Sequence, residues 1–271
     1  MITDVTIGQY LPGTSFMHKM DARVKIVCTL SYIITIFLCK SFWSLGLMVL
    51  AAVFLTLVSR VPICQLMRAL RPVVFILLFT AVLNLFYSKS GAVLWQWRFL
   101  VLTDKGVYTA VFMAVRILSL IAVSALLTYT TTPTALTDGI EKLLSPLKLV
   151  KVPVHSLAMM MTLALRFIPT LIEEIDRIMR AQKARGADLE TGGFITRAKA
   201  LLPILIPLFV SAFRRAYDLA YAMECRCYRG GDGRTRMKQM KLGVRDALAI
   251  VFHIALIAGV ILLGKLFQPL I

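Results

Sequence analysis

Five long stretches with almost no charged residues constrain this chain more than any other feature. Apart from Arg116 they contain no lysine, arginine, aspartate or glutamate, and they occupy residues 26–39, 41–59, 72–88, 106–137 and 247–264. A helix needs about 20 mostly apolar residues to cross the hydrocarbon core of a bilayer. The first stretch is short for this, and we expect Lys25 and Lys40 on either side of it to extend their ammonium groups to the two interfaces. The pattern predicts an all-α membrane protein with about five transmembrane helices.

The composition excludes the other broad classes of protein. Hydrophobic residues make up 59% of the chain and charged residues 17%, with a mean hydropathy of +0.80. Soluble globular domains contain roughly 45–50% apolar residues, and disordered chains contain fewer. The net charge is nevertheless +17, so a large basic excess must lie outside the hydrocarbon.

The basic residues predict how the chain is oriented, because lysine and arginine accumulate in short cytoplasmic loops. With a cytoplasmic N-terminus, most of them lie on the inner side, including those between residues 142 and 245. Residues 154–172 and 198–213 are also apolar, but a crossing by the first would carry Arg177, Arg180 and Arg185 to the outer side. We therefore expect three parts: an N-terminal segment with four transmembrane helices, a cytoplasmic domain and a last transmembrane helix, at residues 1–132, 133–242 and 243–271.

Within the cytoplasmic domain the pattern predicts one short helix and two long ones. Asp138 and Glu141 have the spacing of a capping arrangement at the start of the short helix, which prolines end. The long helices are expected at residues 154–185 and 194–226, each apolar at its beginning and charged at its end. At 1.5 Å per residue each would extend roughly 48 Å.

The two long helices end in similar sequences. In each, a small residue, an arginine and another small residue follow one another, at Ala184-Arg185-Gly186 and at Cys225-Arg226-Cys227. The unpaired carbonyls at a helix C-terminus favour a cation, and a guanidinium can bind a partner carboxylate through two hydrogen bonds. These triplets are candidate binding sites for a partner; the alternative is ordinary capping of a helix end.

The sequence resembles the T component (EcfT family) of energy-coupling factor (ECF) transporters, a class of ABC importers. The resemblance rests on residues 8–10, residues 20–25, the succession of spans and the two arginine triplets. It implies a transmembrane scaffold in a prokaryotic cell membrane, in which each triplet docks one of two cytosolic ATPase subunits. It also implies that those ATPases bind the ATP and magnesium, and that they drive the reorientation of a separate substrate-binding S component for vitamin or micronutrient uptake.

The apolar first halves of the long helices are the predicted surface for the S component. Methionine suits such a surface because its side chain is flexible and polarisable; burial against the other spans is the alternative. The candidate residues are Leu157, Met159, Met160, Met161, Leu201 and Leu205.

No catalytic, cofactor or metal site is expected in this chain. Residues 259–266 approach a phosphate-binding loop, but Leu266 stands where serine or threonine must hold magnesium. Cys225 and Cys227 lack the further ligands of a zinc site. A self-sufficient carrier or membrane enzyme is the alternative to a transporter subunit, although no paired intramembrane acids support it.

The charge pattern predicts the surroundings of two further features. The basic run between Arg229 and Arg245 is expected to contact membrane lipid, at about 1 kcal/mol per basic residue near an anionic surface, and not nucleic acid. Arg116 lies inside a predicted span. It could pair with backbone carbonyls, pair with an acid on another helix, or extend to the interface.

Overall fold

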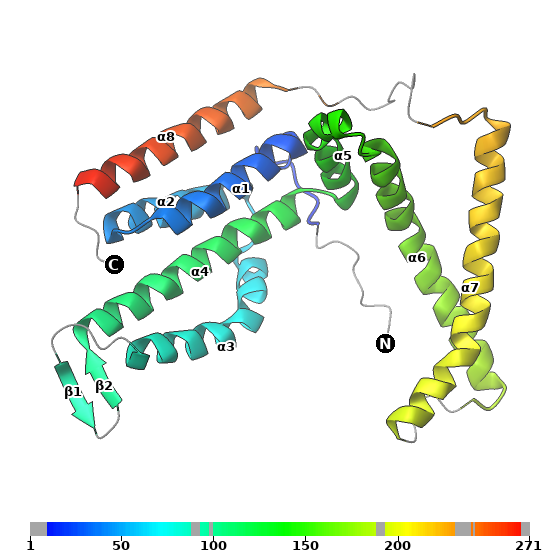
Figure 1. Cartoon of the computed structure of the whole chain (residues 1–271), viewed down its shortest axis with the longest axis horizontal. Helices are drawn as coiled ribbons and strands as arrows, with labels where there is room; N and C mark the ends of the chain where they lie inside the picture. The colour runs from blue at the N-terminus through cyan, green and yellow to red at the C-terminus, as the bar shows by residue number, and fades with distance from the viewer. Residues whose placement is uncertain are drawn as a thin grey trace. The chain divides into compact units, whose positions relative to one another are not determined.

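The computed structural model describes residues 10–87, 93–97, 100–187, 193–230, 240 and 242–266. The described chain is almost entirely helical, which confirms the predicted fold class (Figure 1). The elements are α1 (Ala22–Leu38), α2 (Phe42–Ser59), α3 (Ile63–Tyr87), β1 (Val93–Trp97), β2 (Leu100–Thr103), α4 (Asp104–Thr130), α5 (Pro133–Leu143), the 3-10 helix η1 (Ser145–Val150), α6 (Val154–Ala184), α7 (Phe194–Cys225) and α8 (Val244–Leu266). The antiparallel pair β1–β2 was not predicted.

The chain divides into two compact units. Of the described residues, those from 10 to 139 and from 240 to 266 form the bundle unit, and those from 140 to 230 form the long-helix unit. In the bundle unit α4 packs against α1, α2 and α3, and α8 packs against α1 and α2; in the long-helix unit α6 packs against α7.

Six helices in the described part of the chain are long and apolar enough to cross a membrane: α2, α3, α4, α6, α7 and α8. Four of them match predicted spans. The predicted span at residues 26–39 corresponds to α1, which has only 17 residues and is not among the six. Length and composition therefore also admit α6 and α7, and the cytoplasmic location of these two helices stays a prediction.

A proline divides one of the uncharged stretches. The stretch 106–137 comprises parts of two helices, because α4 ends at Thr130 and Pro133 begins α5. Proline favours the first position of a helix, and Thr132 Oγ1 accepts a hydrogen bond from the Ala135 N–H at 3.3 Å as an N-cap. Asp138 consequently lies in the middle of α5, so the predicted capping role is wrong. Helix α3 begins at Ile63, before the uncharged stretch 72–88, because Arg68 and Arg71 lie within the helix, which continues through Pro72.

The core of the bundle unit lies where α1, α2, α4 and α8 meet. Its largest fully buried side chains are aromatic or long aliphatic residues, among them Tyr32, Ile36, Met48 and Phe112. Tyr32 also satisfies its hydroxyl, which donates to the Met48 carbonyl at 3.0 Å and lies 2.8 Å from Ser119 Oγ. Aromatic and polar contacts thus fix the register of α1 against both α2 and α4.

Helices α1 and α4 each supply a cation to the C-terminal end of the other. Lys25 of α1 donates to the Thr130 carbonyl at 2.9 Å and to Thr131 Oγ1 at 3.2 Å, at the end of α4. Arg116 of α4 donates to the carbonyl of Cys39, the C-cap of α1, at 2.6 Å. Carbonyls at a helix C-terminus lack intrahelical partners and carry partial negative charge. Of the three roles open to Arg116, the structure shows pairing with a backbone carbonyl.

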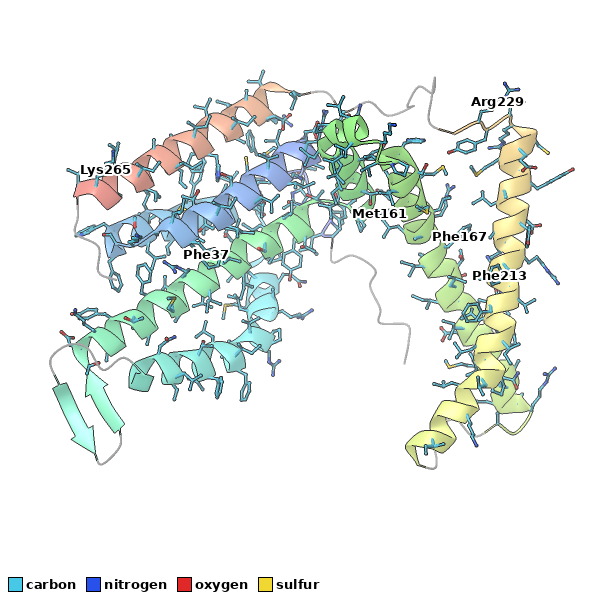
Figure 2. All side chains as sticks on the ribbon, in the orientation of Figure 1. Phe37, Met161, Phe167, Phe213, Arg229 and Lys265 are labelled. Carbon is cyan, nitrogen blue, oxygen red and sulfur yellow. The ribbon has the colours of Figure 1, made fainter. Side chains whose placement is uncertain are left out.

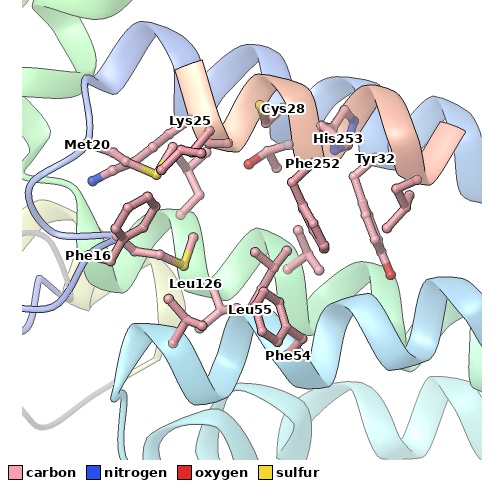
Figure 3. Close-up of a pocket in the computed structure, with 18 residues that line it drawn as sticks. Phe16, Met20, Lys25, Cys28, Tyr32, Phe54, Leu55, Leu126, Phe252 and His253 are labelled. Atoms are coloured by element: carbon pink, nitrogen blue, oxygen red, sulfur yellow. The ribbon is translucent and has the colours of Figure 1, made fainter. Parts of the chain in front are cut away.

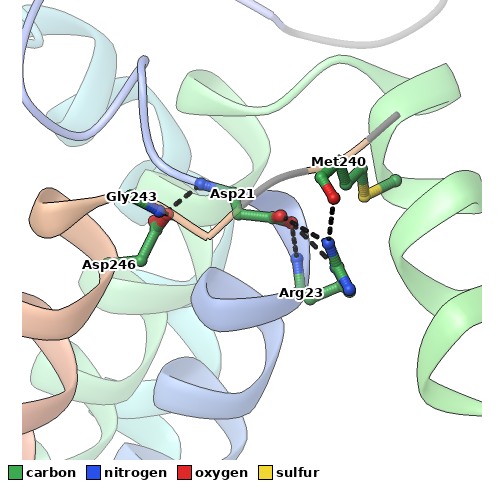
Figure 4. A network of polar contacts seen from close by, with 5 residues as sticks. All are labelled: Asp21, Arg23, Met240, Gly243 and Asp246. Carbon is green, nitrogen blue, oxygen red and sulfur yellow. Dashed lines mark hydrogen bonds and ion pairs between the residues drawn. The ribbon is translucent and has the colours of Figure 1, made fainter. Parts of the chain in front are cut away.

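A polar network joins the starts of α1 and α8 (Figure 4). The Asp246 carboxylate accepts from the Asp21 N–H at 2.9 Å through one oxygen and from the Gly243 N–H at 2.8 Å through the other. Asp21 is the N-cap of α1 and pairs with Arg23, which also donates to the Met240 carbonyl at 2.9 Å. One buried carboxylate thus satisfies backbone donors at the beginnings of two helices.

We predict that Lys25→Met destabilises the bundle unit by about 1–3 kcal/mol, because it leaves the Thr130 carbonyl without its donor in a buried site. The measurement is thermal unfolding of the full chain in detergent. Lys40→Met is the matched control, because Lys40 is exposed. Equal melting temperatures for the two variants would contradict the prediction.

Candidate functional site

The end of α6 has a defined backbone structure around the first arginine triplet. Ala184 is the last residue of the helix, Arg185 is its C-cap, and Gly186 has a φ of +85°. The Gly186 N–H donates to the Lys183 carbonyl and the Ala187 N–H donates to the Gln182 carbonyl, both at 3.0 Å. These two bonds form the Schellman arrangement that ends a helix after a left-handed residue.

The end of α7 has the same structure around the second triplet. Cys225 is the last residue of the helix, Arg226 is its C-cap, and Cys227 has a φ of +58°. The Cys227 N–H donates to the Glu224 carbonyl at 2.8 Å and the Tyr228 N–H donates to the Met223 carbonyl at 3.0 Å. A cysteine therefore occupies the left-handed position that Gly186 occupies in α6. The similarity between the two triplet sequences thus corresponds to the same backbone structure at both helix ends.

Both arginine side chains are available to a partner. All six residues of the two triplets are exposed. Among the residues that the structure describes, neither Arg185 nor Arg226 makes an ion pair or a side-chain hydrogen bond. Since backbone N–H groups satisfy carbonyls of the last turn, capping does not occupy the guanidinium groups.

The two triplets lie at opposite ends of one antiparallel helix pair. Three contacts between α6 and α7 define the direction: Tyr228 Oη donates to Met159 Sδ at 3.2 Å, Arg215 pairs with Glu174, and Gln182 Nε2 donates to the Pro203 carbonyl at 3.4 Å. Figure 2 agrees, with Met161 near the start of α6 and Arg229 beyond the end of α7. A helix of 31 residues is about 46 Å long, so roughly this length separates the two tips.

The contact between Gln182 and Pro203 has a local cause. Pro207 has no N–H, so the Pro203 carbonyl four residues earlier lacks the helical hydrogen bond that it would otherwise accept. The Gln182 amide supplies a donor from α6. The proline pair in α7 therefore creates an acceptor that holds the two helices together near the Arg185 tip.

The six candidate residues for an apolar docking surface differ in exposure. Met159 is half-buried and contacts Tyr228. The other five expose 43–54% of their surface: Leu157, Met160, Met161, Leu201 and Leu205. Burial within the chain is therefore incomplete for all six residues.

Comparison with known proteins identifies the family. A family model described as the cobalt transport protein CbiQ matches residues 13–238. The chain is 51% identical to the energy-coupling factor transporter transmembrane protein EcfT of Ruminiclostridium cellulolyticum, over 98% of this chain and 100% of the relative. It is 54% identical to the protein of that name from Clostridium kluyveri, over 95% of this chain and 96% of the relative, and 43% identical to the one from Bacillus subtilis, over 95% and 97%.

The chain belongs to the CbiQ/EcfT family. It is a multi-pass membrane protein and the transmembrane component of an energy-coupling factor transporter. The resemblance drawn from the arginine triplets and the spans is confirmed.

An exposed aromatic stripe along α7 begins in the predicted apolar first half of the helix and continues beyond it, into a part that the sequence did not indicate as a docking surface. Phe209 and Phe213 stack with their centroids 6.4 Å apart, and Tyr217 and Tyr221 continue the stripe at 76% and 71% exposure. A surface depression lies over this part of the helix, between Ile206 and Asp218. The spacing of three and four residues was readable from the sequence, but the apolar candidates were sought only at the beginning of the helix.

We predict opposite effects of two changes at the left-handed positions. Gly186→Ala should weaken the end of α6 by about 1–2 kcal/mol, because a side chain disfavours positive φ, and Cys227→Gly should strengthen the end of α7. Hydrogen exchange of the amides in the last turn of each helix measures both effects.

Gly193→Ala is the matched control for the first change. Apart from the chain neighbours, no described atom lies within 4 Å of a Cβ added at either glycine, but Gly193, the N-cap of α7, has a φ of −71°. Equal effects at Gly186 and Gly193 would show that backbone strain does not determine stability at the tip.

Proposed function

We propose that this chain is the scaffold through which two cytosolic ATPase subunits drive an ECF-type importer. Each ATPase binds one arginine tip, and α6 and α7 couple ATP hydrolysis to reorientation of a substrate-binding S component during vitamin or micronutrient uptake. The observation that carries the proposal is a pair of exposed arginine tips with the same backbone structure, at opposite ends of one helix pair and without an ion pair among the described residues. Two equivalent sites, far apart, suit two copies of one kind of partner.

The chemistry of each tip suits an acidic groove. A guanidinium binds a carboxylate through two parallel hydrogen bonds, and this geometry fixes orientation as well as affinity. The Schellman turn fixes the backbone that carries the arginine, so little conformational entropy is lost when the partner binds. The small neighbours Ala184, Gly186 and Cys227 allow a close approach.

The helix pair is suited to transmit a displacement. The pairing of Glu174 with Arg215 and the contact between Gln182 and Pro203 tie α6 to α7 at separate points. A force applied at either tip therefore acts on both helices. We place the long-helix unit and the N-terminus on the cytoplasmic side, in accordance with the distribution of basic residues.

Nucleotide chemistry is assigned to the partners. The glycine-containing segment of residues 259–266 lies within helix α8, so its backbone N–H groups are engaged in the helix and do not form a loop around a phosphate. ATP and magnesium are bound by the ATPase subunits, and this chain contributes no catalytic group.

The S component is proposed to dock on the apolar surface of α6 and α7. Support comes from the exposure of Leu157, Met160 and Leu205 and from the aromatic stripe of α7. Exposed apolar surface of this extent marks interaction sites with proteins or lipid. Flexible methionine side chains allow the same surface to accommodate different partners.

We predict that Arg185→Glu and Arg226→Glu each remove one ATPase from the assembled complex, and that the double variant removes both. Loss of one member of a desolvated charge pair costs about 2–5 kcal/mol, and charge reversal adds repulsion. Native mass spectrometry of the complex purified with its partners gives the number of ATPases bound.

Arg180→Glu and Arg229→Glu are the controls, because both arginines are exposed and close to the tips in sequence. Retention of two ATPases by the double variant would refute the proposed docking. Substrate transport by the isolated chain in vesicles would refute the coupling role altogether.

We predict that Leu201→Arg combined with Leu205→Arg releases the S component while both ATPases remain bound. Two charges on the proposed apolar surface must be desolvated for the S component to pack there. Co-purification of each partner measures the outcome, with Leu149→Arg as the control at an 89% exposed position of the same unit. Simultaneous loss of the ATPases would indicate that the variant disrupts the helix pair instead.

A further inference from the structure

The bundle unit contains an apolar cavity of about 370 Å³. Helices α1, α2, α4 and α8 and the segment before α1 form its wall, and Figure 3 shows Phe16, Phe54, Leu126 and Phe252 around it. On α8 the lining extends from Leu248 to Leu256, about 12 Å along the helix. Protein interiors rarely leave voids much larger than a water molecule, whereas this volume is in the range of ligand sites.

The residues that line the cavity offer few polar atoms that could hydrogen-bond to water. Lys25 uses its ammonium group on the Thr130 carbonyl and on Thr131, and the Tyr32 hydroxyl contacts the Met48 carbonyl and Ser119. Cys28, Thr29 and His253 also line the cavity, and the buried His253 Nε2 has no hydrogen bond among the described residues. An ordered water needs two to four polar partners, and apolar cavities stay dry and accept apolar ligands. The chemistry of the wall therefore favours a hydrocarbon chain.

A basic group lies beside this cavity. A second, more open depression shares Phe16, Phe54 and Val58 with the cavity and adds Thr14, Ser15, Leu57 and Arg60. Arg60 ends α2 and is exposed. Its guanidinium has no ion pair or hydrogen bond with the residues described in this structure. A planar guanidinium of this kind binds phosphate through two hydrogen bonds.

We propose that the bundle unit binds one anionic phospholipid, with an acyl chain in the cavity and its phosphate at Arg60. The apolar wall recognises the chain, and the charge of Arg60 and the exposed hydroxyl of Thr14 recognise the headgroup. The lining residues belong to four helices of the bundle unit, three of which are long and apolar enough to cross a membrane. Basic pockets between membrane helices are a recognised type of site for anionic lipid headgroups.

The site is tested with photoreactive lipid. The full chain is reconstituted in phosphatidylcholine vesicles containing phosphatidylglycerol with a diazirine in its acyl chain, irradiated, and analysed by peptide mass spectrometry. We expect labels on the cavity-lining faces of α2 and α8. Arg60→Gln should lower this labelling about five-fold, the contribution of one basic residue to binding of anionic lipid, and Ala249→Phe should abolish it by filling the cavity.

Two matched controls accompany these variants. Arg68→Gln removes an exposed arginine of α3 outside the site, and Ala255→Phe enlarges an exposed residue of α8 that does not line the cavity. In both variants the cavity-lining residues should be labelled to the same extent as in the unmodified chain. A melting temperature for each variant shows whether it is folded, and Arg60→Gln tests the proposal at a surface position if Ala249→Phe does not fold.

Three results would overturn the proposal. Labels confined to outward-facing residues and equal in all variants would indicate ordinary contact with bulk lipid. Equal cavity labelling by a diazirine phosphatidylcholine would show that the site does not select an anionic headgroup. Cavity labelling by a diazirine fatty acid, without labelling by phosphatidylglycerol, would assign the site to a free fatty acid.

Discussion

The carbonyl groups at the C-terminus of a helix have no intrahelical partner, and in a membrane no water is present to replace one. In the bundle unit, each of the antiparallel helices α1 and α4 supplies a side-chain donor to a carbonyl at the end of the other. Lys25 of α1 binds the end of α4, and Arg116 of α4 binds the end of α1. The two charges that would be costly in hydrocarbon thereby become the groups that hold the helix pair in register, with Tyr32 and Ser119 in contact between them.

At the ends of α6 and α7, backbone N–H groups and not side chains bind the last carbonyls. The arginine side chains there consequently remain available to a partner. There the backbone closes on itself through Schellman bonds, so that carbonyls are satisfied without the arginine side chain. A guanidinium that is not needed for capping, placed next to a helix end with partial negative charge, is free to bind a partner. The charge on Lys25 and Arg116 serves the fold, whereas the charge on Arg185 and Arg226 is available for assembly.

Features governed by local sequence were predictable, and features that depend on tertiary pairing were not. The long helices were expected at residues 154–185 and 194–226 and occur at Val154–Ala184 and Phe194–Cys225, because apolar periodicity and terminal residues encode them. The residue type of Cys227 gave no signal for its positive φ, since cysteine is not typical of that conformation; only its alignment with Gly186 pointed to it. The sequence could not identify the partner of Arg116 either, because Cys39 is distant in sequence, at the end of α1, and contributes only its backbone carbonyl.

Contacts with distant parts of the chain hold the start of α1 in place. Asp21 caps α1 and donates its N–H to Asp246, and Arg23 holds the Met240 carbonyl at the end of the connection from α7. On the connection toward α6, Gly139 of α5 lies so close to α1 that an added Cβ would meet the Ala22 Cβ at 3.2 Å. Two segments distant in sequence therefore contact the first turns of α1, which Lys25 in turn fixes to α4.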